Sequence, residues 1–168
     1  MSAAAMSPDA HAIDPALAAR VAELLGDYVA AIDDDTLEAW PELFVADGQY
    51  RILSRENVAL GLPAPLVYYY SQGMLRDRVT ALRTALTYQY VYTRHVTSPP
   101  RVRRRADGDL EVRSDFAIYQ STEEGVTTLY AVGRYDDVVT THEGRLRFRR
   151  RDVILDTFGI PNNISVPL

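Results

Sequence analysis

The feature that most constrains the fold is a long β-rich region in the last third of the chain, residues 112–158. Turn sequences around Gly108, Gly125 and Gly144 separate segments that are rich in β-branched and aromatic residues. Such residues favour a pleated, half-buried surface, and glycine beside acidic residues is typical of a tight turn. The pattern predicts consecutive long antiparallel strands, which the helices upstream must cover.

The region upstream predicts helices with short strands between them. Asp14 and Pro15 have the arrangement of an N-cap followed by proline at the first helical position, and apolar residues then recur at helical spacing as far as Ile32. A short helix is expected next at 36–45, with a capping box of Asp35 and Glu38, followed by a turn at 46–48 and a strand at 49–54. A loop at 55–65 then leads to a short strand at 66–70 and a helix at 73–86. Alternating tyrosines at 88–92 precede strands from 93 onward, with a break at 98–100.

Helices followed by consecutive antiparallel strands indicate an α+β fold. We expect a cystatin-like or NTF2-like cone, in which a long curved antiparallel sheet carries about three helices from the N-terminal half on its concave face. Residues 1–13 are expected to form a flexible N-terminal tail, and residues 14–168 a single NTF2-like domain.

The composition excludes several classes of function. The 168 residues include no cysteine, which rules out disulfides, thiolate nucleophiles and cysteine-ligated iron–sulfur clusters in this chain. The three histidines, His11, His95 and His142, do not have the spacing of metal ligands. A net charge of −5 gives no support for nucleic-acid binding, and neither a signal peptide nor a membrane-spanning run is expected, so a soluble cytoplasmic protein is the default.

His95 is the titratable residue of most interest, because it stands in the middle of an expected strand. We interpret it first as a structural histidine that is hydrogen-bonded to the backbone or to a carboxylate. In the alternative interpretation it is a general acid or base in the cone of a free-standing dehydratase or isomerase, oriented by Asp33 or Asp34 or working with a tyrosine. A third possibility is a small-ligand-binding module whose wall is formed by some of the eleven tyrosines.

Two arginine-rich strand segments, 101–105 and 145–151, could form contacts with another protein or with phosphate. Alternation along a strand sends only about half of such side chains to one face. We favour a solvated face or ion pairs with an acidic partner surface, and take as candidates for subunit contact Arg101, Arg103, Arg147, Arg149 and Arg151. The apolar loop at 55–65 is expected to pack on its own domain, with a partner contact as the alternative.

Several stretches, taken in order, resemble one family, the small (β) subunits of aromatic-ring-hydroxylating oxygenases with Rieske and non-haem iron centres. These stretches are AWPELF at 39–44 with DGQYR at 47–51, MLRDRV at 74–79, Arg94 and His95 with RV at 101–102, and DVILD at 152–156 with NNISVPL at 162–168. REN at 55–57 and GLP at 61–63 are most similar to small subunits of salicylate 5-hydroxylases, followed by those of terephthalate dioxygenases.

The resemblance implies a structural subunit without a catalytic residue, within an α3β3 assembly that stands on a trimer of β subunits. The large (α) subunit would hold a Rieske [2Fe–2S] cluster and a mononuclear iron, neither of which a chain without cysteine and with scattered histidines can supply. Electrons would come from NAD(P)H through a separate reductase and, in many systems, a ferredoxin. An aromatic carboxylate, such as a salicylate- or terephthalate-like compound, would be the substrate of the complex.

Overall fold

The computed structural model describes residues 13–62, 64–84, 91–156, 164 and 166–168. In chain order the elements are α1 (Pro15–Asp33), two 3-10 turns η1 (Leu37–Ala39) and η2 (Pro41–Leu43), β1 (Phe44–Ser54), α2 (Arg55–Ala59), β2 (Val67–Tyr69), α3 (Gln72–Thr84), β3 (Tyr92–Thr97), β4 (Arg101–Arg104), β5 (Leu110–Ser121), β6 (Thr127–His142) and β7 (Arg145–Leu155).

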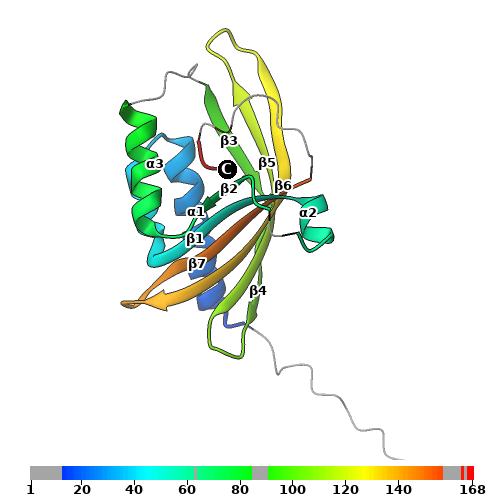
Figure 1. Ribbon diagram of the computed structural model, residues 1–168. Helices are drawn as coiled ribbons and strands as arrows, with labels where there is room; N and C mark the ends of the chain where they lie inside the picture. Colours follow the sequence, from blue (N-terminus) through cyan, green and yellow to red (C-terminus); the bar gives the residue numbers. More distant parts are fainter. Residues whose placement is uncertain (1–12, 63, 85–90, 157–163, 165) are drawn as a thin grey trace, which may run out of the picture.

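The seven strands form one curved sheet with the order β2-β1-β7-β6-β5-β3, and β4 also pairs with β5 (Figure 1). The long strands β5, β6 and β7 are consecutive antiparallel neighbours, as the sequence predicts. The pairing of β1 with β7 is parallel, so the sheet is mixed where a wholly antiparallel one was expected. The predicted α+β cone is confirmed, with this one difference in strand direction.

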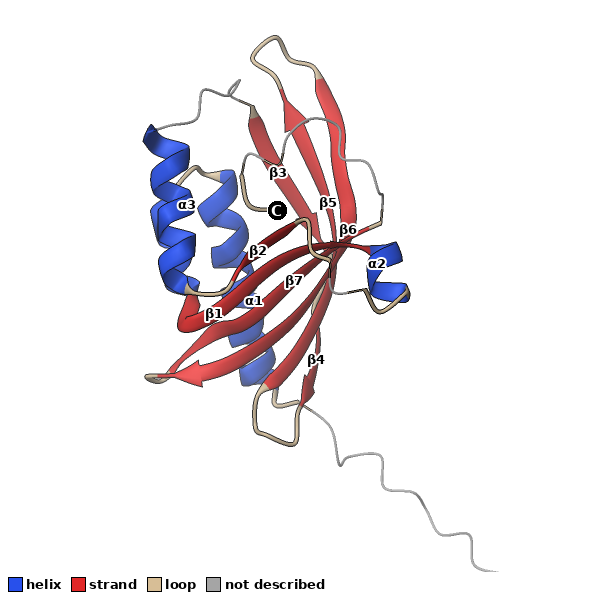
Figure 2. Cartoon of the chain, viewed as in Figure 1, coloured by secondary structure: helices blue, strands red, loops and turns tan. Residues whose placement is uncertain are grey.

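Helices α1 and α3 lie together on one side of the sheet, and the short α2 lies apart from them at the end of β1 (Figure 2). Asp14 begins α1 as predicted, because its carboxylate accepts a hydrogen bond of 3.1 Å from the main-chain nitrogen of Ala16. The apolar stripe of α1 is buried, including Val21 and Tyr28, and α3 buries Leu75, Val79 and Leu82. Both stripes pack on the inward-facing residues of the strands and form one core with them.

The second predicted helix, at 36–45, is wrong. Proline at position 41 cannot continue a helical ladder, and the chain makes two single 3-10 turns before β1 begins at Phe44. Trp40 between them is fully buried against the ring of Tyr50, with 5.3 Å between ring centroids. The predicted capping box does not form, because Asp35 has a positive φ of 54° and its carboxylate binds Arg83 of α3 at 2.7 Å.

The turn predicted at 46–48 is also wrong, because these residues lie within β1 as a bulge between Phe44 and Gln49. Gly48 allows the bulge, since a Cβ atom there would come within 2.8 Å of the carbonyl oxygen of Val45.

The 55–65 segment begins with α2, which Ser54 caps by accepting a hydrogen bond from the main-chain nitrogen of Asn57. Leu60, Leu62 and Leu66 are exposed, so a partner contact for this segment stays a prediction. The predicted helix at 73–86 is present as α3, Gln72–Thr84. Several predictions fall outside the described residues: positions 85 and 86 of that helix, the tyrosines at 88 and 90, residues 1–12 of the expected tail, and Asn162 and Asn163 of the family resemblance. Among the helices that are described, none is long and apolar enough to cross a membrane.

Candidate functional site

The interior of the cone contains a fully buried arginine, Arg151 of β7. Its guanidinium carbon lies 3.7 Å from the ring centroid of Tyr28 and 3.8 Å from that of Tyr135, so two aromatic faces enclose the cation. Cations in this position are stabilised by the negative faces of the rings. Arg151 therefore belongs to the core, and its prediction as a subunit-contact residue is wrong.

A β-bulge explains why Arg151 points inward. Across β6 and β7, Val139 pairs with Phe148 and Val138 pairs with Arg150, so Arg149 is an extra residue without a partner in the register. The bulge reverses the alternation of side chains, and Phe148 and Arg151 come to share the inward face. Strict alternation from Phe148 would have placed Arg150 inside instead.

Asp137 of β6 neutralises the buried arginine. Its carboxylate oxygen Oδ2 lies 3.1 Å from Arg151 Nη1, and both side chains are at most 1% exposed. Burial raises the pKa of Asp137 to about 7, although the nearby Arg151 acts in the opposite direction. Three buried atoms of this cluster, Arg151 Nε, Asp137 Oδ1 and the Tyr135 hydroxyl, have no hydrogen-bond partner among the described residues. The cluster is a buried ion pair within an aromatic core.

Leu168, the last residue of the sequence, belongs to the same core and is 1% exposed (C in Figure 1). The Tyr28 hydroxyl donates a hydrogen bond of 2.5 Å to its carbonyl oxygen, and its main-chain nitrogen donates one of 2.9 Å to the Tyr50 hydroxyl. Arg78 of α3 also binds this tail, through the carbonyl oxygen of Ile164 at 3.1 Å. Burial raises the pKa of both tyrosines, so they remain protonated and act as hydrogen-bonding groups. The end of the chain is thus held in the core by hydrogen bonds to Tyr28 and Tyr50.

The structure brings Asp33 and His95 together, as one alternative in the sequence analysis requires. Asp33 ends α1, and its carboxylate accepts hydrogen bonds from His95 Nδ1 at 2.6 Å and from the His95 main-chain nitrogen at 2.9 Å. Both side chains are buried, since that of His95 is 0% exposed and that of Asp33 is 1% exposed, whereas the neighbouring Asp34 is exposed. His95 Nε2 has no partner among the described residues. The pair joins the end of α1 to β3, and its imidazole has no surface that a dissolved substrate can reach.

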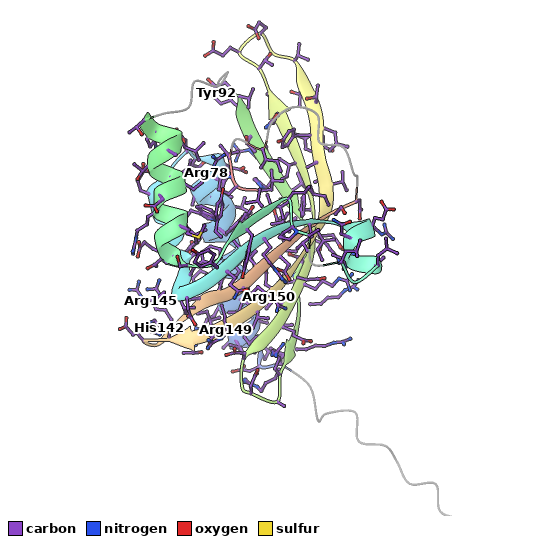
Figure 3. All side chains as sticks on the ribbon, viewed as in Figure 1. Arg78, Tyr92, His142, Arg145, Arg149 and Arg150 are labelled. Carbon is purple, nitrogen blue, oxygen red and sulfur yellow. The ribbon has the colours of Figure 1, made fainter. Side chains whose placement is uncertain are left out.

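The other predicted contact residues lie on the surface. Arg101 and Arg103 project from β4, Arg147 donates to the carbonyl oxygen of Glu42, and Arg149 binds Asp109 at 2.8 Å. Figure 3 shows His142 and Arg145 at the end of the β6–β7 hairpin and Arg149 farther along, towards Arg150. A role of these four arginines in subunit contact stays a prediction.

Metal ligation finds no support in the part of the chain that the structure describes. No group of three or more histidine, cysteine or carboxylate side chains comes together there, and His11 lies outside that part. Together with the lack of cysteine in the sequence, the donor set does not fit a Rieske cluster or a site of two histidines and a carboxylate.

The sequence did not predict two features of the site: the buried Arg151–Asp137 pair between Tyr28 and Tyr135, and the burial of Leu168 beside Tyr28 and Tyr50. A weak signal was available, because two consecutive aspartates, 136–137, and three consecutive arginines, 149–151, stand on the two strands of the expected hairpin, and the structure pairs Asp137 with Arg151 and Asp136 with Asp152. Complementary charges on adjacent strands form cross-strand pairs. Which of them is internal depends on the bulge, which the sequence does not mark.

Comparison with known proteins gives consistent matches. Residues 28–162 match the family model described as ring hydroxylating beta subunit. The small subunit of anthranilate 1,2-dioxygenase from Burkholderia cepacia is 36% identical, over 84% of this chain and 88% of that protein. Subunit beta 1 of the terminal oxygenase component of terephthalate 1,2-dioxygenase from Comamonas is 33% identical, over 84% and 92%. A crystal structure described as the beta subunit of an aromatic-ring-hydroxylating dioxygenase from Novosphingobium aromaticivorans is 33% identical, with a TM-score of 0.82 over 91% of this chain and 97% of that one.

Proposed function

Since the chain belongs to the family of ring hydroxylating beta subunits, we propose that it is the non-catalytic small subunit of an aromatic-ring-hydroxylating oxygenase and that it stabilises the complex. The observation that supports the non-catalytic role is the set of buried residues inside the cone. Leu168 and the Arg151–Asp137 pair are buried there, and burial raises the pKa of Tyr28 and Tyr50, so both tyrosines stay protonated. A free-standing enzyme of this shape would need an open polar pocket at that place.

The iron chemistry then falls to the partner. A Rieske [2Fe–2S] cluster needs two cysteines and two histidines, and a mononuclear non-haem Fe(II) needs two histidines and a carboxylate. The large subunit would supply both sets and receive electrons from NAD(P)H through a separate reductase, with a ferredoxin in many systems. This chain would contribute surface that holds the large subunits in place.

We further propose an α3β3 complex, based on a trimer of this chain, in the cytoplasm. The names of two relatives support an aromatic carboxylate as substrate of the complex, since anthranilate and terephthalate both carry a carboxylate on the ring. Selection of that substrate would occur in the large subunit, beside the mononuclear iron.

The contact between Asp33 and His95 supports a test of the alternative function, a free-standing dehydratase or isomerase that uses this pair or a tyrosine. In the assembled oxygenase, His95→Ala is expected to leave turnover within about twofold of the native value. The variant should lose about 1–3 kcal/mol of unfolding free energy, because the buried Asp33 carboxylate loses a hydrogen-bond donor. Steady-state turnover and urea unfolding measure the two effects.

Asp34→Ala is the matched control, because it removes an exposed carboxylate beside Asp33 and should change neither quantity. General acid–base catalysis contributes about 100-fold or more to a rate. A loss of turnover of that size in an intact His95→Ala complex would favour the rival. Saturable binding of an aromatic acid by the isolated chain would likewise favour a ligand-binding module.

A further inference from the structure

The outer face of the sheet carries a basic depression of about 360 Å³ across β4, β5, β6 and β7. Its charged lining consists of Arg101, Arg103, Glu111, Arg113, Asp136 and Arg150 together with the buried Asp137. The register places these side chains in adjacent rows, because Arg101 pairs with Arg113, and Arg113 pairs in turn with Asp136. Arg150, labelled in Figure 3, closes the depression on β7.

The acidic residues of the depression are already occupied. Asp136 lies 3.4 Å from Arg113 and 3.1 Å from Arg134, and Glu111 lies 3.4 Å from Arg105. The Asp137 carboxylate is used by Arg151 inside the cone.

Arg101 and Arg103 form no ion pair with any residue that the structure describes. Arg101 also stands directly opposite Arg113 in the β4–β5 ladder. Like charges at directly opposite positions destabilise a strand pair. Arg103 stands opposite Glu111, but the carboxylate of Glu111 lies 3.4 Å from Arg105. Among the described residues, Arg101 therefore has no acidic residue opposite it, and Arg103 shares its acidic neighbour with Arg105.

We propose that the basic depression binds a segment of the large subunit that is rich in aspartate or glutamate. The inference rests on the proposed function and specifies the surface and chemistry of the partner. Guanidinium groups bind carboxylates through two parallel hydrogen bonds, so two free guanidinium groups on one strand fit closely spaced acidic side chains.

A second copy of this chain is a poorer occupant, because its largest described groove carries no net negative charge. That groove lies between α1, the η1–η2 region and the β6–β7 turn, and its charged residues are Arg20, Arg145 and Arg147 with Glu23, Asp27 and Glu42. Three arginines balance three acids there, so the groove offers no surplus carboxylate for the depression.

The test is a double charge reversal, Arg101→Glu with Arg103→Glu, in the full chain co-expressed with its large subunit. The complex should dissociate at a protein concentration at least about tenfold higher than the native complex, because the reversed charges repel the acidic segment. Added salt should weaken the native complex more than the variant complex. The matched control compares the single variants Arg101→Glu and Arg104→Glu. Both reverse one charge on β4, but Arg104 does not line the depression, so only Arg101→Glu should weaken assembly.

In the isolated variant, Arg101→Glu replaces the repulsion of Arg113 by an attraction, whereas Arg103→Glu places a glutamate opposite Glu111. The two effects oppose each other, so the isolated variant should melt close to the native temperature, and its melting curve separates weaker assembly from misfolding. Native-like assembly of the double variant would overturn the inference and leave the proposed function standing. A shift in the oligomeric state of the isolated chain would also overturn it, because the occupant would then be a second copy. Failure of the unmodified chain to assemble would instead count against the proposed function.

Discussion

Asp137→Ala is expected to lower the free energy of unfolding by about 3–5 kcal/mol, the typical cost of removing one partner from a buried ion pair. The Arg151 guanidinium would remain between Tyr28 and Tyr135 without a counter-charge, in a site that is 1% exposed. Urea unfolding at about pH 8 measures the effect, because Asp137 is ionised there in the native protein.

Asp136→Ala is the matched control on the next residue, where the partners Arg113 and Arg134 are partly exposed and the expected loss is about 0–1 kcal/mol. Replacing both buried partners, Asp137→Leu with Arg151→Met, should recover most of the loss, since no charge is then left alone. A loss below about 1 kcal/mol for Asp137→Ala would contradict the description of this pair.

The same pair predicts a pH dependence. The pKa of Asp137 is raised to about 7 by burial, above the value near 3.9 of an unfolded chain. The folded protein therefore holds a proton that the unfolded chain releases, so this group's contribution to stability is complete below about pH 4 and is lost as the pH rises through about 7. In a plot of the free energy of unfolding against pH, Asp137 should contribute a slope of at most about 1.4 kcal/mol per pH unit between these values. Asp137→Asn should remove that contribution.

Leu168→Ala is the second large effect, with an expected loss of about 2–5 kcal/mol. The leucine side chain is almost wholly buried in the core, and its removal leaves a cavity that the rigid surrounding strands cannot close. Thermal and urea unfolding report the change.

Leu168→Met is the control for this position, because it preserves the volume and should cost less than about 1.5 kcal/mol. Equal stability of Leu168→Ala and the native chain would show that Leu168 is not packed in the core in solution.

Local signals were sufficient to predict much of the fold. The cap at Asp14 and the stripe that includes Tyr28 predict α1, and the β-rich segments between turns predict β5, β6 and β7. The parallel pairing of β1 with β7 joins strands that are about a hundred residues apart, and no local pattern specifies such a partner. Proline at position 41 signals the end of a helix, but the two 3-10 turns around it depend on the packing of Trp40.

The site was predictable only in part, for related reasons. Asp33 and Asp34, at the end of the first helix, were the candidate carboxylates for orienting His95, and the structure joins Asp33 to it. Arg151 was assigned to the surface because a single bulged residue, Arg149, reverses the alternation of β7. The position of Leu168 depends on hydrogen bonds to Tyr28 and Tyr50, which are more than a hundred residues away along the chain.

These contacts bear directly on function. Leu168 and the Arg151–Asp137 pair lie buried inside the cone, while Arg101 and Arg103 on the outer face form no ion pair with any described residue. The interior thus serves stability and the outer surface is available for a partner, as expected of a beta subunit in a ring-hydroxylating oxygenase.

Native mass spectrometry of the chain co-expressed with its large subunit tests the central claim most directly. The account predicts a complex with three copies of each subunit, in which hydroxylating activity and iron are retained only when the large subunit is present. A monomeric, separately eluting chain beside a folded and fully active large subunit would contradict it.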